Sequence, residues 1–549
     1  MIPASVPSAP PAASALEKLI LLGRDHYSGG RIGEAITAYQ AGLDVAAAAP
    51  DQVTIETIAK LHADLGNAYM VCGDLNSAAA SYKAALRLAP HLTSCWCNFG
   101  NVQLQNGHAQ EAIALYVQAL KLTPAHWPSR TNLAQALIAT RQYLVAKGLL
   151  LELREERPQD GKVRHQLGKV CHELNDAEAA LSHFQAAIAL NPADADSLYW
   201  IGALRQKLGD LDGARASYVQ AAQIQPLIRR RAVKSPPDFR VLALYAPFAG
   251  NTPAEFLFKN AAYDADTMTL LGADEPALGL LGDVQLIVNL ISDADQGGAV
   301  LSKAARLAER LGKPVINHPS RIECTTRNAI AGLLSDVAGC RIPRILRIAA
   351  GSEVSAATLA ARLPYAFPVL ARPAGTHGGD SFEKIASLAA LADFLRGWPD
   401  SDRYVIEYVD YASADGYFRK YRFIFVGEEV LPYHLAIGNG WKVHHASTDM
   451  ANQPWMQQEE AAFLADPHAV FTPSHYHALD AIRERVGLDY FGIDCALDGV
   501  GNLIVFEVNA SMLVHDDNAE FPYKDAYVHA IKAAFDAMLR RRVGMHHAA

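Results

Sequence analysis

The chain has 549 residues, of which 50% are hydrophobic and 19% are charged. One hydrophobic core does not grow to this size, so we expect about three to four domains of roughly 150 residues each. The 49 basic and 58 acidic side chains give a net charge of -9, which argues against nucleic acid or an anionic membrane surface as a partner. No apolar run approaches the ~20 residues of a membrane-spanning helix.

The two ends of the chain are predicted to lie outside the folded domains. Residues 1–14 are rich in proline, alanine and serine and lack the basic segment of a secretory signal, so we expect a disordered leader. Residues 544–549 are expected to form a solvated tail. The seven cysteines are odd in number and form no paired CxxC motifs, which favours a reducing, cytoplasmic location.

A period of 34 residues organises the first 226 residues. Proline recurs at this spacing, at Pro90, Pro124, Pro158, Pro192 and Pro226. Columns of small and aromatic residues keep the same phase, except that Ala134 and Leu150 stand in one repeat where the others have glycine and an aromatic residue. The pattern resembles the tetratricopeptide repeat, in which two antiparallel helices cross at a small residue and a proline ends the second helix. An earlier unit with Gly23 and Tyr39 makes six repeats over 15–227.

Solenoids of this family present a concave groove that holds peptides or protein segments. The repeat period aligns polar residues along the first helices, in one column of Asp64, Asn98, Asn132 and Gln166 and in a neighbouring column of Asn67 and Asn101. Because an amide offers both a donor and an acceptor, we predict that Asn67, Asn98, Asn101 and Asn132 grip an extended backbone. The alternative is that they are solvated polar positions on an exposed helix face.

A second architecture begins after the repeats. A basic cluster and a Pro-Pro pair predict a linker over 228–237. Apolar runs at 239–248 and 283–293 then alternate with a helical stretch at 297–313, followed by a short strand at 314–319. This alternation predicts an α/β layer.

Later segments predict further strands and two hairpins. Strands are expected within 364–385 and 402–411, and hairpins over 420–437 and 488–511, with glycine-bearing turns at Gly427 and at Gly499 to Gly501. No P-loop motif and no GxGxxG motif after a strand occurs, so neither of these nucleotide sites is expected.

Asp494 on one strand of the last hairpin, and Glu507 and Asn509 on the other, form the most informative pattern. Alternation puts Glu507 and Asn509 on one face, and the hairpin brings Asp494 beside them. Three oxygen-bearing side chains would then converge, which suits one or two magnesium ions. The alternative, a surface hairpin with scattered polar groups, fits poorly because both strands are otherwise apolar.

From about residue 238 to 540 the chain resembles an ATP-grasp carboxylate-amine ligase, in the style of the ribosomal-protein glutamylases and D-alanine ligases. Asp494, Glu507 and Asn509 match the metal ligands of that family. The resemblance implies an N-terminal α/β subdomain at 238–320, and nucleotide-binding and catalytic lobes at 321–543. The fold class expected for the whole chain is therefore multidomain: an all-α tetratricopeptide solenoid followed by an α/β and α+β ATP-grasp domain.

The resemblance also implies a nucleotide site. Arg372 stands where the family has a phosphate-binding lysine, which keeps the charge but changes the geometry. The loop that closes over the triphosphate corresponds to the segment with His377, Gly378 and Gly379, where small residues let backbone N–H groups approach phosphate oxygens. The strand that holds adenine corresponds to Glu407 and the backbone of Val409.

The same resemblance assigns two cations, Arg422 and Lys442, to the transferring phosphoryl group.

Two departures from the family pattern are expected to matter. Ala329 occupies the place of a second phosphate-binding lysine, for which Arg327 substitutes only if its helix is rotated. Ser511, Met512 and Leu513 follow Asn509 in place of Pro-Gly, so the loop that meets the acceptor is expected to be reshaped.

The implied reaction uses ATP and Mg²⁺ to phosphorylate a carboxylate, and an amine-bearing co-substrate then attacks the acyl phosphate to form an amide. The long groove favours a peptide or protein substrate. Two alternatives stay open: a non-catalytic repeat scaffold with a nucleotide-sensing ATP-grasp fold, and a small-molecule ligase that uses the repeats for docking or for assembly into a homo-oligomer.

Overall fold

The computed structural model describes residues 11–271, 278–376, 381–443, 448–510 and 512–545. The chain forms two compact units, Met1–Ile224 and Gln225–Ala549. The first is all-helical and the second is rich in strands. Across the ranges described, no helix is both long enough and apolar enough to cross a bilayer.

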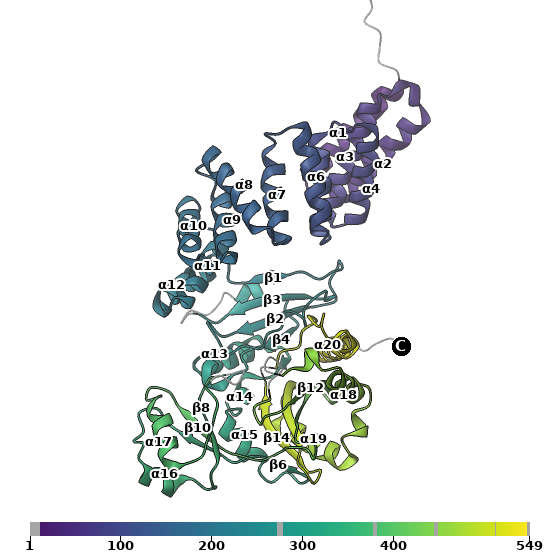
Figure 1. Cartoon of the computed structure of the whole chain (residues 1–549). Coiled ribbons are helices and arrows are strands. Elements are labelled where there is room, and N and C mark those ends of the chain that lie inside the picture. Colours follow the sequence, from purple (N-terminus) through teal and green to yellow (C-terminus); the bar gives the residue numbers. More distant parts are fainter. Residues whose placement is uncertain (1–10, 272–277, 377–380, 444–447, 511, 546–549) are drawn as a thin grey trace, which may run out of the picture. The chain divides into compact units, whose positions relative to one another are not determined.

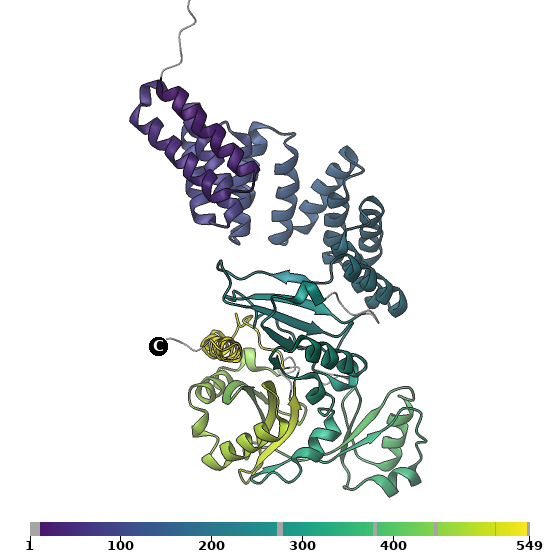
Figure 2. The ribbon, with the colours of Figure 1, turned by 180° about the vertical axis from the view of Figure 1, so that it is seen from behind.

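The N-terminal unit is built from successive antiparallel helix pairs, visible from both sides in Figure 1 and Figure 2. There are six pairs, as the period predicts: α1 (Pro11–Ser28) with α2 (Ile32–Ala48), α3 (Ile55–Cys72) with α4 (Leu75–Leu88), α5 (Thr93–Gln105) with α6 (Ala109–Leu122), α7 (Trp127–Ala139) with α8 (Tyr143–Glu156), α9 (Gly161–Glu173) with α10 (Ala177–Leu190), and α11 (Ala195–Lys207) with α12 (Leu211–Ile224).

The repeat region begins slightly earlier than expected, and its prolines lie where the period predicts. Helix α1 begins at Pro11, inside the segment expected to be a disordered leader. Proline suits the first turn of a helix and the alanines that follow favour helix. From α4 onward, each repeat proline lies two residues after the end of the second helix, which confirms its role as a stop.

The small-residue column has a steric cause. A Cβ atom on Gly66 would lie 2.8 Å from the ring of Tyr82, and one on Gly100 would lie 2.5 Å from the ring of Tyr116. Both tyrosines are fully buried, so neither ring can move aside. The repeat with Ala134 has Leu150 at the aromatic position, and the smaller partner leaves room for the alanine methyl.

The second unit opens with a five-stranded sheet in the order β1-β3-β2-β4-β5. Strands β2 (Arg240–Tyr245), β3 (Asp264–Thr269), β4 (Leu286–Asn289) and β5 (Val315–Ile316) are parallel, and α13 (Ala294–Leu311) packs on them. The strand β1 (Ile228–Arg230) pairs antiparallel with β3. The expected linker 228–237 is thus wrong at its start, because these three residues extend the sheet.

A small lobe follows, with a four-stranded antiparallel sheet in the order β7-β10-β8-β9. Its strands are β7 (Ile345–Ile348), β8 (Val369–Pro373), β9 (Glu383–Ile385) and β10 (Arg403–Glu407), and its helices are α16 (Ala356–Arg362) and α17 (Leu388–Arg396). The lobe has its own apolar core, formed by side chains such as Ile348, Leu391 and Val405.

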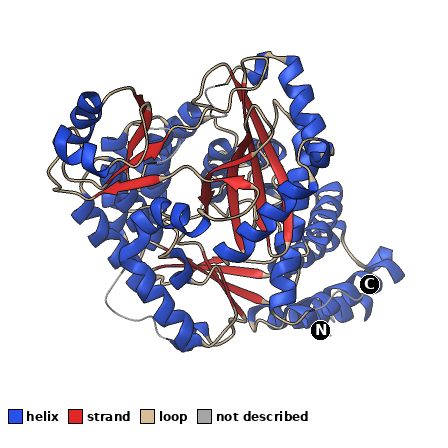
Figure 3. Cartoon of the chain, turned by 90° about the horizontal axis from the view of Figure 1, so that it is seen from below, coloured by secondary structure: helices blue, strands red, loops and turns tan. Residues whose placement is uncertain are grey.

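The third sheet has the order β12-β11-β13-β14-β6, and Figure 3 shows the strands of the three sheets as separate groups. Its strands are β6 (Cys340–Arg341), β11 (Phe418–Val426), β12 (Glu429–Gly438), β13 (Tyr490–Leu497) and β14 (Leu503–Asn509). Both predicted hairpins are confirmed, with positive φ angles at Gly427 and Gly501. One face of the sheet packs Phe423, Phe491 and Val505 into a core with α18 (Pro454–Ala465) and α19 (Pro473–Val486).

The C-terminal helix α20 (Asp525–Arg542) joins the first and third sheets. Its Val528 and Phe535 pack in one core with Phe239 of the first sheet region and Ile424 of β11. The segment 238–320 therefore shares a core with the last helix of the chain.

We expect Gly100→Ala to destabilise the repeats by about 1 to 3 kcal/mol, because its methyl group would overlap the buried ring of Tyr116. Gly148→Ala is the matched control, since nothing lies within 4 Å of a Cβ there, and it should stabilise α8 by up to about 1 kcal/mol. Hydrogen exchange of α5, α6 and α8 in the full chain measures both effects. Equal protection in the two variants would contradict the steric explanation.

Candidate functional site

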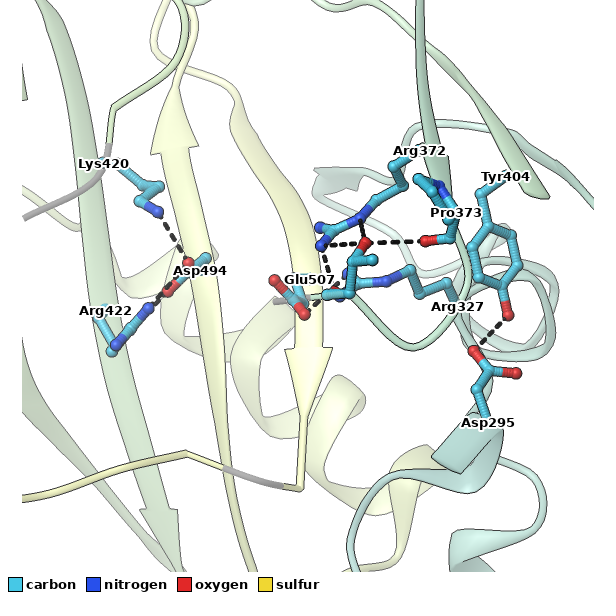
Figure 4. Close-up of polar contacts among 10 residues, drawn as sticks. Asp295, Arg327, Arg372, Pro373, Tyr404, Lys420, Arg422, Asp494 and Glu507 are labelled. Atoms are coloured by element: carbon cyan, nitrogen blue, oxygen red, sulfur yellow. Dashed lines mark hydrogen bonds and ion pairs between the residues drawn. The ribbon is translucent and has the colours of Figure 1, made fainter. Parts of the chain in front are cut away.

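A row of polar side chains crosses four neighbouring strands of the third sheet. His434 on β12 pairs with Arg422 on β11, Arg422 pairs with Asp494 on β13, and Asp494 pairs with Glu507 on β14. Residues directly opposite one another in antiparallel strands point to the same face. The row therefore lies on the face opposite the Phe423 and Phe491 core, and its central part is drawn in Figure 4.

Asp494 is almost fully buried and is held by two cations. Its Oδ1 lies 2.7 Å from Nε of Arg422, and its Oδ2 lies 3.0 Å from Nζ of Lys420. Burial alone would raise the pKa of Asp494, but Arg422 and Lys420 hold this pKa well below its usual range. The carboxylate is therefore ionised at neutral pH.

Glu507 has a different set of cations. Its Oε1 lies 2.7 Å from NH1 of Arg327, at the start of α15 (Arg327–Leu334). Burial opposes ionisation of Glu507, yet the charges of Arg327 and Arg372 lower its pKa despite the neighbouring Asp494. Arg327 thus reaches this site from the first turn of α15, while Ala329 lies two residues further along the helix.

Four cationic side chains surround the two carboxylates: Arg327, Arg372, Lys420 and Arg422. These four cations outnumber the two carboxylates, and Asp293 adds a further negative charge near Arg327. An anionic ligand such as a polyphosphate is complementary to a group of cations of this kind.

An apolar pocket adjoins this cluster. It is small and partly open to solvent, and Arg327 and Glu507 line one part of it. The rest of the lining is apolar: Ile330, Ala331, Leu334, Ile342, Ile345, Val505, Phe506 and Val508. An apolar pocket beside a cationic cluster suits a ligand with a flat apolar part and an anionic part.

Asp494 and Glu507 also fit a divalent cation. They lie opposite each other across two strands, and Asn509 lies two residues beyond Glu507, on the same face of β14. Carboxylate and amide oxygens are the ligands that Mg²⁺ takes in proteins. Among the residues described, no group of three or more His, Cys, Asp or Glu side chains forms a metal cluster, so any ion here would depend on these two carboxylates and the amide.

A second buried carboxylate stands at the β12 end of the row. Glu460 on α18 is 1% exposed and accepts hydrogen bonds from Nδ1 of His434, from the hydroxyl of Tyr523 at 2.7 Å and from the backbone N–H of Leu435 at 3.1 Å. Nζ of Lys524 lies 3.4 Å away. Burial would raise the pKa of Glu460, but His434 and Lys524 lower it to about 2.

Of the two residues assigned to adenine, Glu407 ends β10 and Val409 lies two residues beyond it. The carboxylate of Glu407 pairs with Arg341 at 3.0 Å and with Arg344 at 3.1 Å. The side chain of Val409 is buried against Tyr411 in a small apolar cluster. Neither Glu407 nor Val409 is among the described residues that line the apolar pocket.

The remaining predicted cations lie at the edge of the small lobe. Arg372 on β8 donates to the side chain and backbone oxygens of Thr376, 3.0 Å from Oγ1. Nζ of Lys442 lies 3.5 Å from the carbonyl oxygen of Phe382 rather than beside Asp494. The predicted loop residues His377, Gly378 and Gly379 lie outside the described residues.

Sequence reasoning missed Lys420 and the group around Glu460. Lys420 was detectable, because it stands two residues before Arg422 and alternation puts both on one face. Glu460 and Lys524 come from helices distant in sequence from the hairpin, so no local pattern points to them.

The four groove asparagines form hydrogen bonds between neighbouring repeats. Oδ1 of Asn67 accepts from Nδ2 of Asn98 at 2.9 Å, and Oδ1 of Asn101 accepts from Nδ2 of Asn132 at 2.7 Å. The same two oxygens also accept from the hydroxyls of Tyr82 and Tyr116. The structure thus brings these residues together. Each of the four side chains uses one of its two amide atoms, the oxygen or the nitrogen, to bond to a neighbouring repeat.

Family models identify the repeats. Models described as TPR repeat or tetratricopeptide repeat match residues 59–92, 103–168, 168–209 and 195–226. The N-terminal part of the chain therefore contains tetratricopeptide repeats, which commonly bind peptide or protein partners and suggest a protein-interaction scaffold. No curated protein matches the chain.

Several solved structures resemble part of the chain. MamA from Desulfovibrio magneticus RS-1 is 20% identical over 30% of this chain and 94% of its own, with a TM-score of 0.29. The Pseudomonas aeruginosa protein pilF is 18% identical over 39% and 94%, with a TM-score of 0.33. A thermophilic TPR protein of Thermus thermophilus is 21% identical over 31% and 92%, with a TM-score of 0.28.

We expect Glu460→Gln to cost about 3 to 5 kcal/mol of stability at pH 7, because Lys524 would lose its buried counter-charge. The pKa of Glu460 is lowered from 4.5 to about 2, so its contribution is complete above pH 4.5 and disappears as the pH falls toward 2. Urea unfolding from pH 7 to pH 3 should show the free energies of unfolding of the unchanged protein and of the Glu460→Gln variant approaching each other. Glu428→Gln, the same substitution at an exposed residue of the β11–β12 turn, is the control, and a pH-independent difference would contradict the assignment.

Asn101→Ala should destabilise the repeats by about 1 to 3 kcal/mol, because the hydroxyl of buried Tyr116 and the amide of Asn132 lose their shared acceptor. Gln135 is the matched control: it is exposed and occupies the equivalent position one repeat later. Gln135→Ala should change the free energy of unfolding by less than about 0.5 kcal/mol. Thermal unfolding followed by circular dichroism compares them, and equal losses would show that the asparagine network adds no stability.

Proposed function

We propose that the C-terminal unit is an ATP-dependent carboxylate-amine ligase of the ATP-grasp kind, acting on a peptide or protein that the repeats bind. One observation carries this proposal. Two ionised carboxylates, Asp494 and Glu507, lie opposite each other on neighbouring strands, among four cationic side chains and beside a small apolar pocket. A nucleotide triphosphate with magnesium has the complementary set of parts.

Each part of the cluster has a role in this proposal. The apolar pocket between α15 and β14 takes the base, and Arg327 and Arg372 face the phosphates. Asp494, Glu507 and Asn509 would hold Mg²⁺, which would supply neutralisation of phosphate charge and polarisation of the phosphoryl group. Arg422 and Lys420, which neutralise Asp494 in the structure, are then available to the transferring phosphoryl group.

The chemistry requires positioning more than a protein nucleophile. A free carboxylate is a poor electrophile because its leaving group would be oxide, and phosphorylation by ATP supplies a better leaving group. An amine then attacks the acyl phosphate, an amide forms and phosphate leaves. The chain's own cations keep the reacting oxygens in place and stabilise the charge that develops on them.

The repeats supply the substrate class. Tetratricopeptide repeats commonly bind peptides or proteins, and six of them form far more surface than a small metabolite needs. Binding by the repeats would raise the local concentration of the substrate carboxylate or amine near the ligase unit of the same chain.

Glu507→Gln should reduce ADP formation by about a hundredfold or more, because one of two carboxylates for the metal is lost. The control is Glu429→Gln, the same substitution at an exposed residue at the start of β12. ADP release is measured with purified full-length protein, magnesium, a peptide library and free amino acids. Normal turnover by the Glu507 variant would contradict the site.

The same assay separates the candidate functions. Turnover that requires a peptide supports the proposed substrate class. Turnover with small acids alone identifies a small-molecule ligase that uses the repeats for docking, and nucleotide binding without turnover under any condition identifies a nucleotide-sensing scaffold.

A further inference from the structure

The first turn of α13 contacts two strands of the small lobe through one carboxylate. Oδ2 of Asp295 accepts a hydrogen bond of 2.7 Å from the hydroxyl of Tyr404 on β10. Oδ1 of Asp295 lies 3.1 Å from NH2 of Arg347 on β7. Tyr404 is fully buried and the Asp295 side chain is 10% exposed, so water competes little for these contacts.

The neighbouring contacts involve residues on either side of 377–380, in the connection between β8 and β9. Gln296, next to Asp295, donates to the carbonyl oxygen of Gly375. On the other side of 377–380, the ring of Phe382 packs edge-on against the ring of Trp441, with 5.5 Å between the ring centroids. Nζ of Lys442 contacts the carbonyl oxygen of Phe382. Both described flanks of 377–380 are therefore attached to residues outside the small lobe.

The small lobe depends on such contacts for its position. Its apolar core is built from its own strands and helices, so that core fixes the lobe internally but not its orientation. Contacts of Asp295 with β7 and β10, two adjacent strands of its sheet, restrict both translation and rotation of the lobe relative to α13.

Tyr404 connects this contact to the charged cluster. Figure 4 shows Tyr404 next to Arg327, with Asp295 on the far side of the tyrosine hydroxyl. Arg327 in turn lies 2.7 Å from Oε1 of Glu507. In Figure 4 the side chains of Asp295, Tyr404, Arg327 and Glu507 thus lie in a row from α13 through the small lobe to β14.

We infer that Asp295 is a positioning residue, which fixes the small lobe against α13 through Tyr404 and Arg347 and thereby places Arg327 opposite Glu507. The contact itself stands on the geometry alone. Its consequence for ligand binding rests on the proposed function, since Arg327 and Glu507 face the nucleotide there.

The experiment compares Asp295→Ala and Tyr404→Phe with Tyr365→Phe in the full chain. Tyr365 lies in the same lobe, and its hydroxyl bonds to the carbonyl oxygen of Val405 within that lobe, so its loss leaves the contact with α13 intact. We expect amide exchange in peptides 294–301 and 370–376 to accelerate about tenfold in the first two variants and to stay unchanged in the third. The double variant should exchange no faster than Asp295→Ala alone, because Asp295→Ala already removes the contact that Tyr404→Phe removes.

A second readout measures binding of ATP with magnesium by calorimetry. Tyr404→Phe should weaken it about tenfold, while Tyr365→Phe should leave it within about twofold of the unchanged protein. Thermal unfolding confirms that each variant is folded.

Unchanged exchange at 294–301 in both Asp295→Ala and Tyr404→Phe would overturn the contact as a positioning device. Faster exchange with unaltered ATP affinity would overturn the link to Arg327. If the unchanged protein does not bind ATP, the proposed function fails, and the exchange data still decide whether Asp295 holds the lobe.

Discussion

The C-terminal unit depends on how two like charges are kept together. Asp494 and Glu507 lie directly opposite each other in a β ladder, a position where like charges repel, and Asp494 is buried while the Glu507 side chain is 25% exposed. Such a pair folds only if cations compensate it. The chain supplies them from three places: Lys420 and Arg422 from the adjacent strand, Arg327 from α15, and Arg372 from the small lobe.

This arrangement connects stability to the proposed chemistry. Arginine and lysine side chains that neutralise carboxylates in the structure are also the groups that would contact phosphates. Because they come from different elements, the site forms only when the third sheet, α15 and the small lobe hold their relative places. The contacts of Asp295 belong to this requirement, since they fix the lobe that carries Arg372.

The helical unit satisfies the polar side chains between its repeats with neutral hydrogen bonds rather than with ion pairs. Amides of Asn67, Asn98, Asn101 and Asn132 bond across repeat boundaries and to the hydroxyls of buried tyrosines. Neutral hydrogen bonds need no counter-ion and remain exchangeable with a bound backbone. Side chains that stabilise the stack are thus also those that the groove would offer to a peptide.

Much of the fold was determined by local sequence. The 34-residue period identified the six helix pairs because each repeat contacts mainly its neighbours, and the alternation of apolar residues placed both hairpins and the opposed Asp494 and Glu507. The strand β3 was not predicted, because Asp264 and Asp266 interrupt its apolar pattern. These residues are tolerated there because Arg231 and Arg240 lie beside them in the folded chain.

Only the tertiary structure decided which charges meet. Arg327 reaches Glu507, and Glu460 joins His434 and Lys524, across separations in sequence that no local period records. The contact of Lys442 with the carbonyl oxygen of Phe382 likewise joins residues far apart in the sequence. Local sequence fixes the face on which a side chain lies, whereas the packing of separate elements sets the partner that it meets.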